Sequence, residues 1–196
     1  MLVFLAMCIL AGLYDTFPGD AAAMKWLQSH RSSFLDNAAQ VASFPGNKLV
    51  AALTIVLLVL SLLALRRWMD AVMFASILAP VVVNMALKEI IDRPRPDMTI
   101  LISQPTSPGF PSGHAEYGAL LFLLLFYLAG ELVGTRWLRW LLRIALVLAI
   151  LAMGASRVYL GVHWPSDVLG GYLLGALWVW AVIWARKRLT FGSRRR

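Results

Sequence analysis

The chain consists of apolar runs, most of them near the length that a membrane requires, separated by short polar or basic turns. A helix needs roughly 20 consecutive apolar residues to cross the hydrocarbon core of a bilayer. Backbone groups inside that core must bond to one another, so such runs fold as helices. We expect spanning helices at residues 1–14, 49–65, 71–91, 115–133, 138–155 and 168–185. The predicted fold is an all-α bundle of six transmembrane helices, forming one domain over residues 1–196.

Composition supports this class and excludes others. Of the 196 residues, 60% are hydrophobic and 14% are charged, and the mean hydropathy is +0.74. These values exclude an ordinary soluble domain and fit a polytopic membrane protein. The net charge of +8 does not indicate nucleic-acid binding, because the cations lie in turns and at the C-terminus, not in one basic stripe. We expect a lipid bilayer as partner and no nucleic acid, and the sequence indicates no oligomeric state.

A mixed segment separates the first two apolar runs. Between residues 20 and 43, apolar side chains alternate with charged ones such as Lys25, Arg31 and Asp36. This pattern is typical of a helix that lies in the membrane interface. We expect one or two short amphipathic helices at the membrane surface.

The distribution of cations predicts the orientation. Six spans would place both termini on one side of the membrane. Most of the 18 lysines and arginines would lie on that side, namely Arg66, Arg67, Arg136, Arg139, Arg143, Arg186, Lys187, Arg188, Arg194, Arg195 and Arg196. Cytoplasmic loops carry such an excess. We therefore expect a cell-membrane protein with cytoplasmic termini, and any site on the opposite face is extracytoplasmic.

Three polar clusters lie on that opposite face, at residues 88–96, 111–114 and 156–167. Charge at the edge of a membrane segment is costly, so by default it suggests a functional site. Each side chain taken singly also has a structural interpretation, as a helix cap or as a cation that extends to the membrane surface. The convergence of three clusters on one face favours a shared site.

The cations in these clusters suit a phosphate. Arg95 and Arg157 offer guanidinium groups that match phosphate oxygens in pairs, and Lys88 adds a point charge. Ser112 offers a hydroxyl, and Gly113 offers a backbone N–H at the start of a helix, where anions bind readily. These residues predict a phosphate pocket.

Two histidines supply the chemistry. His163 and Asp167 are four residues apart, so a carboxylate one helical turn on can orient the imidazole for attack on phosphorus. His114 is placed to protonate the departing oxygen and then to activate water. His114, His163 and Asp167 also match a metal-ligand set, but three adjacent cations oppose a divalent ion. We therefore expect no metal and no cofactor.

The motifs resemble those of a known family. Lys-x6-Arg-Pro from Lys88, Pro-Ser-Gly-His from Pro111, and Ser-Arg-x5-His-x3-Asp from Ser156 resemble the three-part signature of the type 2 phosphatidic acid phosphatase superfamily. The resemblance implies a helical bundle with an outward-facing, metal-independent site. It implies that His163 is the nucleophile, Asp167 its orienting carboxylate and His114 the acid. The implied phosphate pocket comprises Lys88, Arg95, Ser112, Gly113 and Arg157, with Ser156 in support.

The resulting hypothesis is a lipid phosphate phosphatase. We expect hydrolysis of phosphatidylglycerophosphate, phosphatidate or undecaprenyl diphosphate through a phosphohistidine. Gly113 stands where some short undecaprenyl diphosphatases carry aspartate, which slightly favours a glycerophospholipid or broad substrate range. Alternatives are a lipid phosphotransferase with the same intermediate, a vanadate-dependent haloperoxidase, whose relatives are typically soluble, and a transporter. A transporter should carry its polar groups near the membrane midplane.

Polar residues beside the motifs receive structural interpretations. Asp92, Arg93 and Asp97 are expected to be solvated loop residues or members of local ion pairs. Glu116 and Tyr117 lie within the first turn of a predicted helix, where the alternatives are a place at the substrate entrance and, as we expect, helix packing or local hydrogen bonds.

Overall fold

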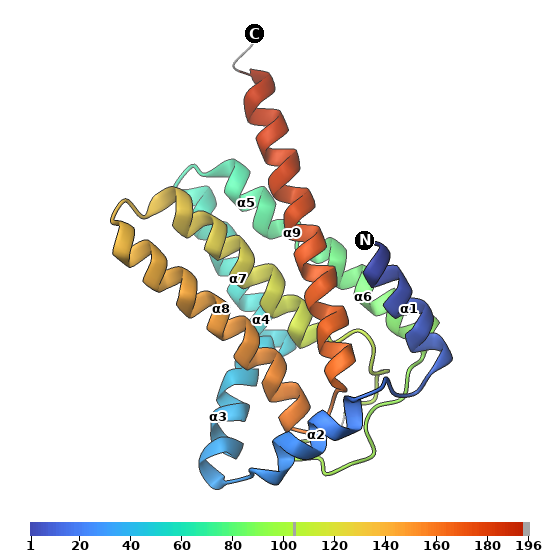
Figure 1. Ribbon diagram of the computed structural model, residues 1–196. Helices are drawn as coiled ribbons and strands as arrows, with labels where there is room; N and C mark the ends of the chain where they lie inside the picture. The colour runs from blue at the N-terminus through green and yellow to red at the C-terminus, as the bar shows by residue number, and fades with distance from the viewer. Residues whose placement is uncertain (104, 194–196) are drawn as a thin grey trace.

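The computed structural model describes residues 1–103 and 105–193, and Figure 1 shows the helical elements in their order along the chain. Those elements are α1 (Leu2–Leu13), α2 (Asp20–Ser29), α3 (Ser33–Ser43), the 3-10 turn η1 (Phe44–Gly46), α4 (Lys48–Ala64), α5 (Trp68–Ala75), α6 (Leu78–Ile91), α7 (Gly113–Leu132), α8 (Arg136–Tyr159) and α9 (Pro165–Ser193). The described residues contain no β-strand, so the all-α prediction is confirmed.

The number of spans differs from the prediction. Among the described residues, four stretches are long and apolar enough to cross a membrane, at Trp68–Ile91, Gly113–Leu132, Arg136–Tyr159 and Pro165–Leu189. A fifth is obtained only if Ser33–Gly46 and Lys48–Ala64, bent by 51° at their junction, count as one broken span. Helix α1 has 12 residues, fewer than the roughly 20 that a span needs. The multi-span class is therefore confirmed, while the count of six is not.

Local chemistry explains two of the helix breaks. Asn47 caps α4 by accepting a hydrogen bond from the backbone N–H of Leu49 at 3.1 Å, which fixes the start of that helix after η1. Pro80 lacks the N–H that would bond to the carbonyl of Ser76, so the ladder between α5 and α6 is interrupted. That carbonyl instead accepts from Ala79 at 3.1 Å.

The mixed segment forms two helices, as expected. Helices α2 and α3 pack against α8, at the end of the bundle where α8 meets α9 (Figure 1). Ser32 caps α3 by accepting from the backbone N–H of Leu35 at 3.2 Å. A position in the membrane interface stays a prediction for both helices.

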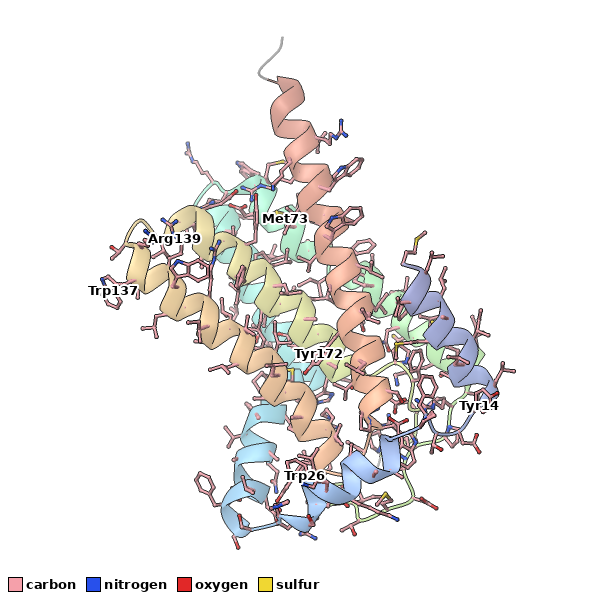
Figure 2. All side chains as sticks on the ribbon, viewed as in Figure 1. Tyr14, Trp26, Met73, Trp137, Arg139 and Tyr172 are labelled. Atoms are coloured by element: carbon pink, nitrogen blue, oxygen red, sulfur yellow. The ribbon has the colours of Figure 1, made fainter. Side chains whose placement is uncertain are left out.

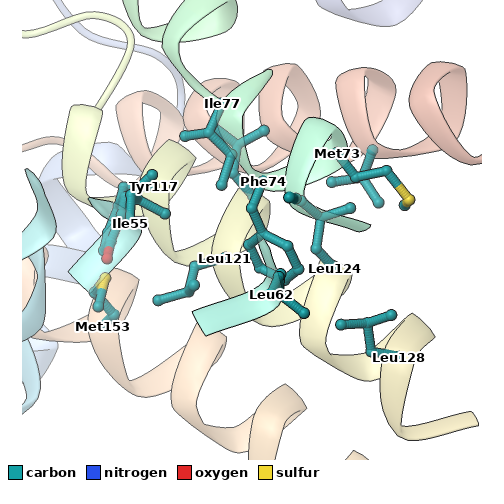
Figure 3. Close-up of a cluster of buried hydrophobic side chains, with 13 residues drawn as sticks. Ile55, Leu62, Met73, Phe74, Ile77, Tyr117, Leu121, Leu124, Leu128 and Met153 are labelled. Carbon is teal, nitrogen blue, oxygen red and sulfur yellow. The ribbon is translucent and has the colours of Figure 1, made fainter. Parts of the chain in front are cut away.

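Helix α7 is at the centre of the bundle. Leu120 and Leu124 are fully buried, and Figure 3 shows Leu121 and Leu124 packed among side chains from neighbouring helices, including Phe74 of α5. In a membrane such contacts act through close packing, because lipid is as apolar as the helix surfaces.

Two small residues bring α9 directly against α7. A Cβ atom on Gly171 would meet the Ser112 carbonyl oxygen, and one on Gly175 would lie 2.9 Å from the carbonyl oxygen of Glu116. Glycines four residues apart allow a close approach between helices, and here the helix that approaches α9 is α7. It brings the N-terminal ends of α7 and α9 together.

The end of the bundle away from these N-termini is held by an ionic network. Arg186 of α9 lies 3.0 Å from Asp70 of α5 and 2.9 Å from Glu131 of α7, and Arg67 also pairs with Asp70. In Figure 2, Arg139 and Trp137 lie at this end, far from Trp26 of α2. The basic turn between α7 and α8 and the polar helix α2 therefore lie at different ends of the molecule.

Candidate active site

The three polar clusters meet where α6 ends and where α7 and α9 begin. Helix α6 ends at Ile91 because Asp92 adopts a left-handed backbone conformation with φ 48°. The chain then passes the N-terminal end of α9 before α7 begins at Gly113 (Figure 1). The backbone N–H of Ser112 donates to the carbonyl of Asp167 at 2.9 Å, which joins the two helix starts.

His163 lies in the turn between α8 and α9 and is only 3% exposed. Its Nε2 is 3.2 Å from Nη1 of Arg95, and its Nδ1 is 3.4 Å from Oδ2 of Asp167. A guanidinium can only donate, so Nε2 must be the lone-pair nitrogen and Nδ1 must carry the proton. The nitrogen available for attack therefore faces the cations, while the other faces the carboxylate.

The surroundings of His163 keep its ring neutral. Burial lowers the pKa of His163 well below 6.5, and the positive charges of Arg95, Lys88 and Arg157 lower it further. A hydrogen bond from the ring to the Gly109 carbonyl acts in the opposite direction but does not overcome burial. A neutral imidazole at physiological pH is the form that can act as a nucleophile.

This shift predicts the pH dependence. Because the pKa is lowered from 6.5, the ring stays unprotonated as the pH falls through that value, and activity is lost only near the depressed pKa. We expect kcat/KM, divided by the ionised fraction of the substrate phosphate, to show no acidic limb as the pH falls through 6.5 to below about pH 6. An acidic limb at or above pH 6.5 would contradict the prediction.

Cations line the space in front of His163. Arg95 is fixed by donating from Nη1 to the Val162 carbonyl and from Nε to the Ser107 carbonyl, each at 2.6 Å. Lys88 donates to the carbonyls of Pro108 at 2.6 Å and Gly109 at 3.2 Å. Three of these carbonyls belong to the α6–α7 loop, which therefore holds both cations beside His163.

Two donors predicted for phosphate binding have no partner among the described residues. They are Nε of Arg157 and Oγ of Ser112, both buried. Arg157 is anchored from its other side, where Nη1 donates to Ser43 Oγ at the end of α3. Buried donors without acceptors are costly, and the oxygens of a bound phosphate would satisfy them.

His114 lies in the first turn of α7, close enough to Arg157 for the guanidinium charge to act on its ring. Its ring rests against the backbone of Gly46 in η1, where a Cβ atom would lie 2.8 Å from Cγ of His114. The sequence showed no sign of this contact, since 68 positions separate the two residues.

Replacing Gly46 with alanine is therefore expected to displace His114. The φ of Gly46 is not in the left-handed region, so the effect should come from the contact and not from backbone strain. A displacement of about 1 Å can cost about 10²-fold in rate, and we expect kcat to fall by about 10- to 100-fold. The control is Gly134→Ala, because no described atom lies within 4 Å of a Cβ at Gly134. Equal activity of the two variants would show that the contact is not needed.

The metal interpretation receives no geometric support. Within residues 1–103 and 105–193, no three histidine, cysteine, aspartate or glutamate side chains are grouped so that they could hold a metal ion. Oδ1 of Asp167 is taken by Arg93 at 2.6 Å. The cations around His163 match an anion instead.

Ser156 is directed elsewhere than expected. It is 3% exposed, and its hydroxyl donates to the Met153 carbonyl of its own helix at 2.6 Å. Its supporting role in phosphate binding stays a prediction.

Arg93 corrects the interpretation of the residues beside the first motif. It is 1% exposed and reaches Asp167, Ser166 and Asp20, and so it is not a solvated loop residue. The sequence offered no local signal, because Arg93 precedes its partners on α9 by more than 70 positions. Glu116, in contrast, is buried inside the bundle as its packing interpretation requires, with Oε1 unpartnered among the described atoms.

A family model decides the identity of this fold. The model of the PAP2 superfamily matches residues 70–191, which include all three motifs. The chain belongs to the PAP2 superfamily.

Comparison with individual proteins agrees with this assignment. The PAP2 chain is 43% identical over 96 residues to phosphatidylglycerophosphatase B of Bacillus subtilis, covering 48% of this chain and 46% of that protein. It is 41% identical over 83 residues to an undecaprenyl-diphosphatase of Sulfolobus acidocaldarius, covering 41% and 34% respectively. The matched stretches thus span less than half of these relatives.

Solved structures extend the likeness to the fold. The crystal structure of a transmembrane PAP2-type phosphatidylglycerolphosphate phosphatase from Bacillus subtilis superimposes with a TM-score of 0.84. It is 28% identical and covers 95% of this chain and 94% of that one. The α6–α7 loop and the helix starts therefore lie within a fold shared along nearly the whole chain.

A polar cavity adjoins Arg95 in this PAP2 chain. It has a volume of about 610 Å³ and is lined by Glu89, Asp92, Arg93, Pro94, Arg95, Pro105, Thr106, Ser107 and Pro108. Ser107, whose carbonyl accepts from Nε of Arg95, is one of the lining residues. The cavity offers space for a polar group beside Arg95.

Proposed function

We propose that this protein hydrolyses the phosphate ester or diphosphate of a membrane lipid through a phosphohistidine on His163. The observation that carries the proposal is the orientation of His163, with Nε2 toward Arg95 and Nδ1 toward Asp167. The substrate class is that of phosphatidylglycerophosphate, phosphatidate or undecaprenyl diphosphate. Two of these lipids correspond to the names of the relatives.

In the first step, Nε2 of His163 attacks phosphorus in line with the bond to the lipid oxygen. The N–P bond forms as the P–O bond breaks, and His114 gives its proton to the departing oxygen. Asp167 stabilises the positive charge that the imidazole ring gains. Lys88, Arg95 and Arg157 hold the equatorial oxygens, where positioning and electrostatics supply most of the catalysis.

In the second step, water replaces the lipid. His114, now unprotonated, takes a proton from the water molecule as its oxygen attacks phosphorus. The N–P bond breaks, inorganic phosphate leaves, and His163 returns to its neutral state. These two steps require no metal ion, since protein cations balance the phosphate charge throughout.

The cell membrane is the proposed location, with the site on the extracytoplasmic side. Support comes from the basic turns and the C-terminal cations, which exceed those near the site. Reporter fusions at the C-terminus are expected to report the cytoplasm, and an extracytoplasmic signal would reverse the orientation.

Phosphate release tests the activity. Detergent-purified protein is supplied with phosphatidate, phosphatidylglycerophosphate, undecaprenyl phosphate or undecaprenyl diphosphate in excess EDTA. Release of phosphate in EDTA would support the metal-independent reaction, and the ranking of lipids would identify the preferred class. A phosphorylated acceptor with little free phosphate would instead indicate a lipid phosphotransferase.

A further inference from the structure

A buried charged network lies directly behind the proposed nucleophile. Arg93, Asp20, Ser166 and Asp167 are 1%, 3%, 4% and 0% exposed. Only Asp167 is a specified residue of the three motifs, since Arg93 and Ser166 occupy variable positions within them, and the two-step reaction above uses none of the other three. Buried charges are costly unless they are paired and hydrogen-bonded, so such a cluster requires an explanation.

Arg93 uses its guanidinium fork to hold several groups at once. Nη1 donates to Asp167 Oδ1 at 2.6 Å and to Ser166 Oγ at 2.8 Å, and Nη2 donates to Asp20 Oδ2 at 3.1 Å. Nε donates to the carbonyl of Asp15 at 3.0 Å. Because the fork is planar and rigid, these bonds fix its orientation.

Asp20, at the start of α2, holds the fork from the other side. Its Oδ1 accepts from the backbone N–H of Ser166 at 2.9 Å, and its Oδ2 accepts from Ser166 Oγ at 2.6 Å and from Phe17 N–H at 2.9 Å. Asp20 thereby caps the first turn of α9 from 146 positions away in the chain. The side chain of Phe17 lies against the guanidinium, 4.6 Å from ring centroid to Cζ of Arg93.

In this network the two carboxylate oxygens of Asp167 have different partners. Oδ1 is held by Arg93 at 2.6 Å, which leaves Oδ2 to face His163 Nδ1 at 3.4 Å and to accept from Trp164 N–H at 3.0 Å. Without Arg93, this fully buried carboxylate would lose its nearest opposite charge and could rotate about its side-chain bonds. Either change would weaken its hold on the Nδ1 proton.

We propose that Arg93, held in place by Asp20, is a positioning residue that keeps Asp167 charged and directed at His163. The segment from Asp15 to Asp20 is then part of the catalytic machinery, although it lies outside the region matched by the family model. The inference rests on the phosphatase function proposed above.

The test compares Asp20→Asn and Arg93→Lys with a matched control. Asp20→Asn keeps the shape but removes the charge that holds the fork, and Arg93→Lys keeps the charge but removes the fork. We expect kcat to fall by about 10- to 100-fold in both, with KM within about twofold of the wild type. The control is Asp70→Asn, which removes a carboxylate of 2% exposure from an ion pair with Arg67 and Arg186 at the other end of the bundle.

A purely structural role predicts a different result. In that case Asp20→Asn and the control Asp70→Asn would lose thermal stability and activity in the same proportion. The kcat of the folded fraction would be unchanged in both variants. This result would overturn the inference. A KM increase without a kcat decrease would overturn it as well.

A second readout does not depend on turnover. In protein labelled with ¹⁵N-histidine, His163 is expected to carry its proton on Nδ1, and the Asp20→Asn and Arg93→Lys variants to shift that tautomer balance. A balance unchanged from wild type would count against the positioning role. If the wild type releases phosphate from no substrate, the proposed function fails, and these spectra alone decide whether Arg93 positions Asp167.

Discussion

Replacing His163 with alanine is expected to lower kcat for lipid phosphate hydrolysis by at least about 10⁴-fold. The substitution removes Nε2, the nitrogen whose lone pair faces Arg95, and an enzyme without its nucleophile keeps only the residual effect of binding and electrostatics. KM should change little, because Lys88, Arg95 and Arg157 remain. The measurement is phosphate release under saturating lipid.

The control for this variant is His30→Ala. His30 ends α2, is exposed, and bonds through Nδ1 to the Trp26 carbonyl at 2.9 Å. Full activity of His30→Ala beside an inactive His163→Ala would assign the loss to one histidine. Protein denatured with SDS at alkaline pH, where the N–P bond of phosphohistidine is stable, should carry label from a ³²P-labelled substrate in the wild type and in His30→Ala but not in His163→Ala. Wild-type-like turnover by His163→Ala would refute the phosphohistidine.

Replacing His114 with glutamine is expected to lower kcat by about 10²- to 10⁴-fold, the usual contribution of a general acid or base. Glutamine fills the space beside Gly46 but can neither protonate the lipid oxygen nor deprotonate water. Both steps should therefore slow when the leaving group is a lipid alkoxide.

An activated substrate separates the two steps. With p-nitrophenyl phosphate, departure needs no protonation, so His114→Gln should release one equivalent of p-nitrophenol quickly and then stop as phosphorylated His163. The same burst is absent if His114 acts only by packing, because both steps would then run at the wild-type rate. If the variant showed neither the burst nor steady turnover, His114 would be assigned to phosphate binding instead.

The sequence by itself determined the multi-span helical class of the protein and predicted which residues form its site. Apolar runs predicted a helical membrane protein because only regular helices satisfy their backbone in lipid. Lys88, Arg95, Ser112, Arg157 and His163 were predicted because buried charge beside apolar runs is rarely tolerated without a function. The spacing of His163 and Asp167 predicted their pairing, because residues four apart lie on the same face of one helical turn.

The tertiary structure decided what depends on distant residues. Among the described residues, the six predicted spans became four, or five with a bent pair, because α1 has 12 residues and α4 has 17, so neither counts as a span alone. Gly46 beside His114, and Asp20 and Arg93 behind Asp167, are brought together from separate segments by helix packing. Spacing within a segment is set by local backbone geometry, whereas these contacts exist only once α2, η1, α7 and α9 have packed.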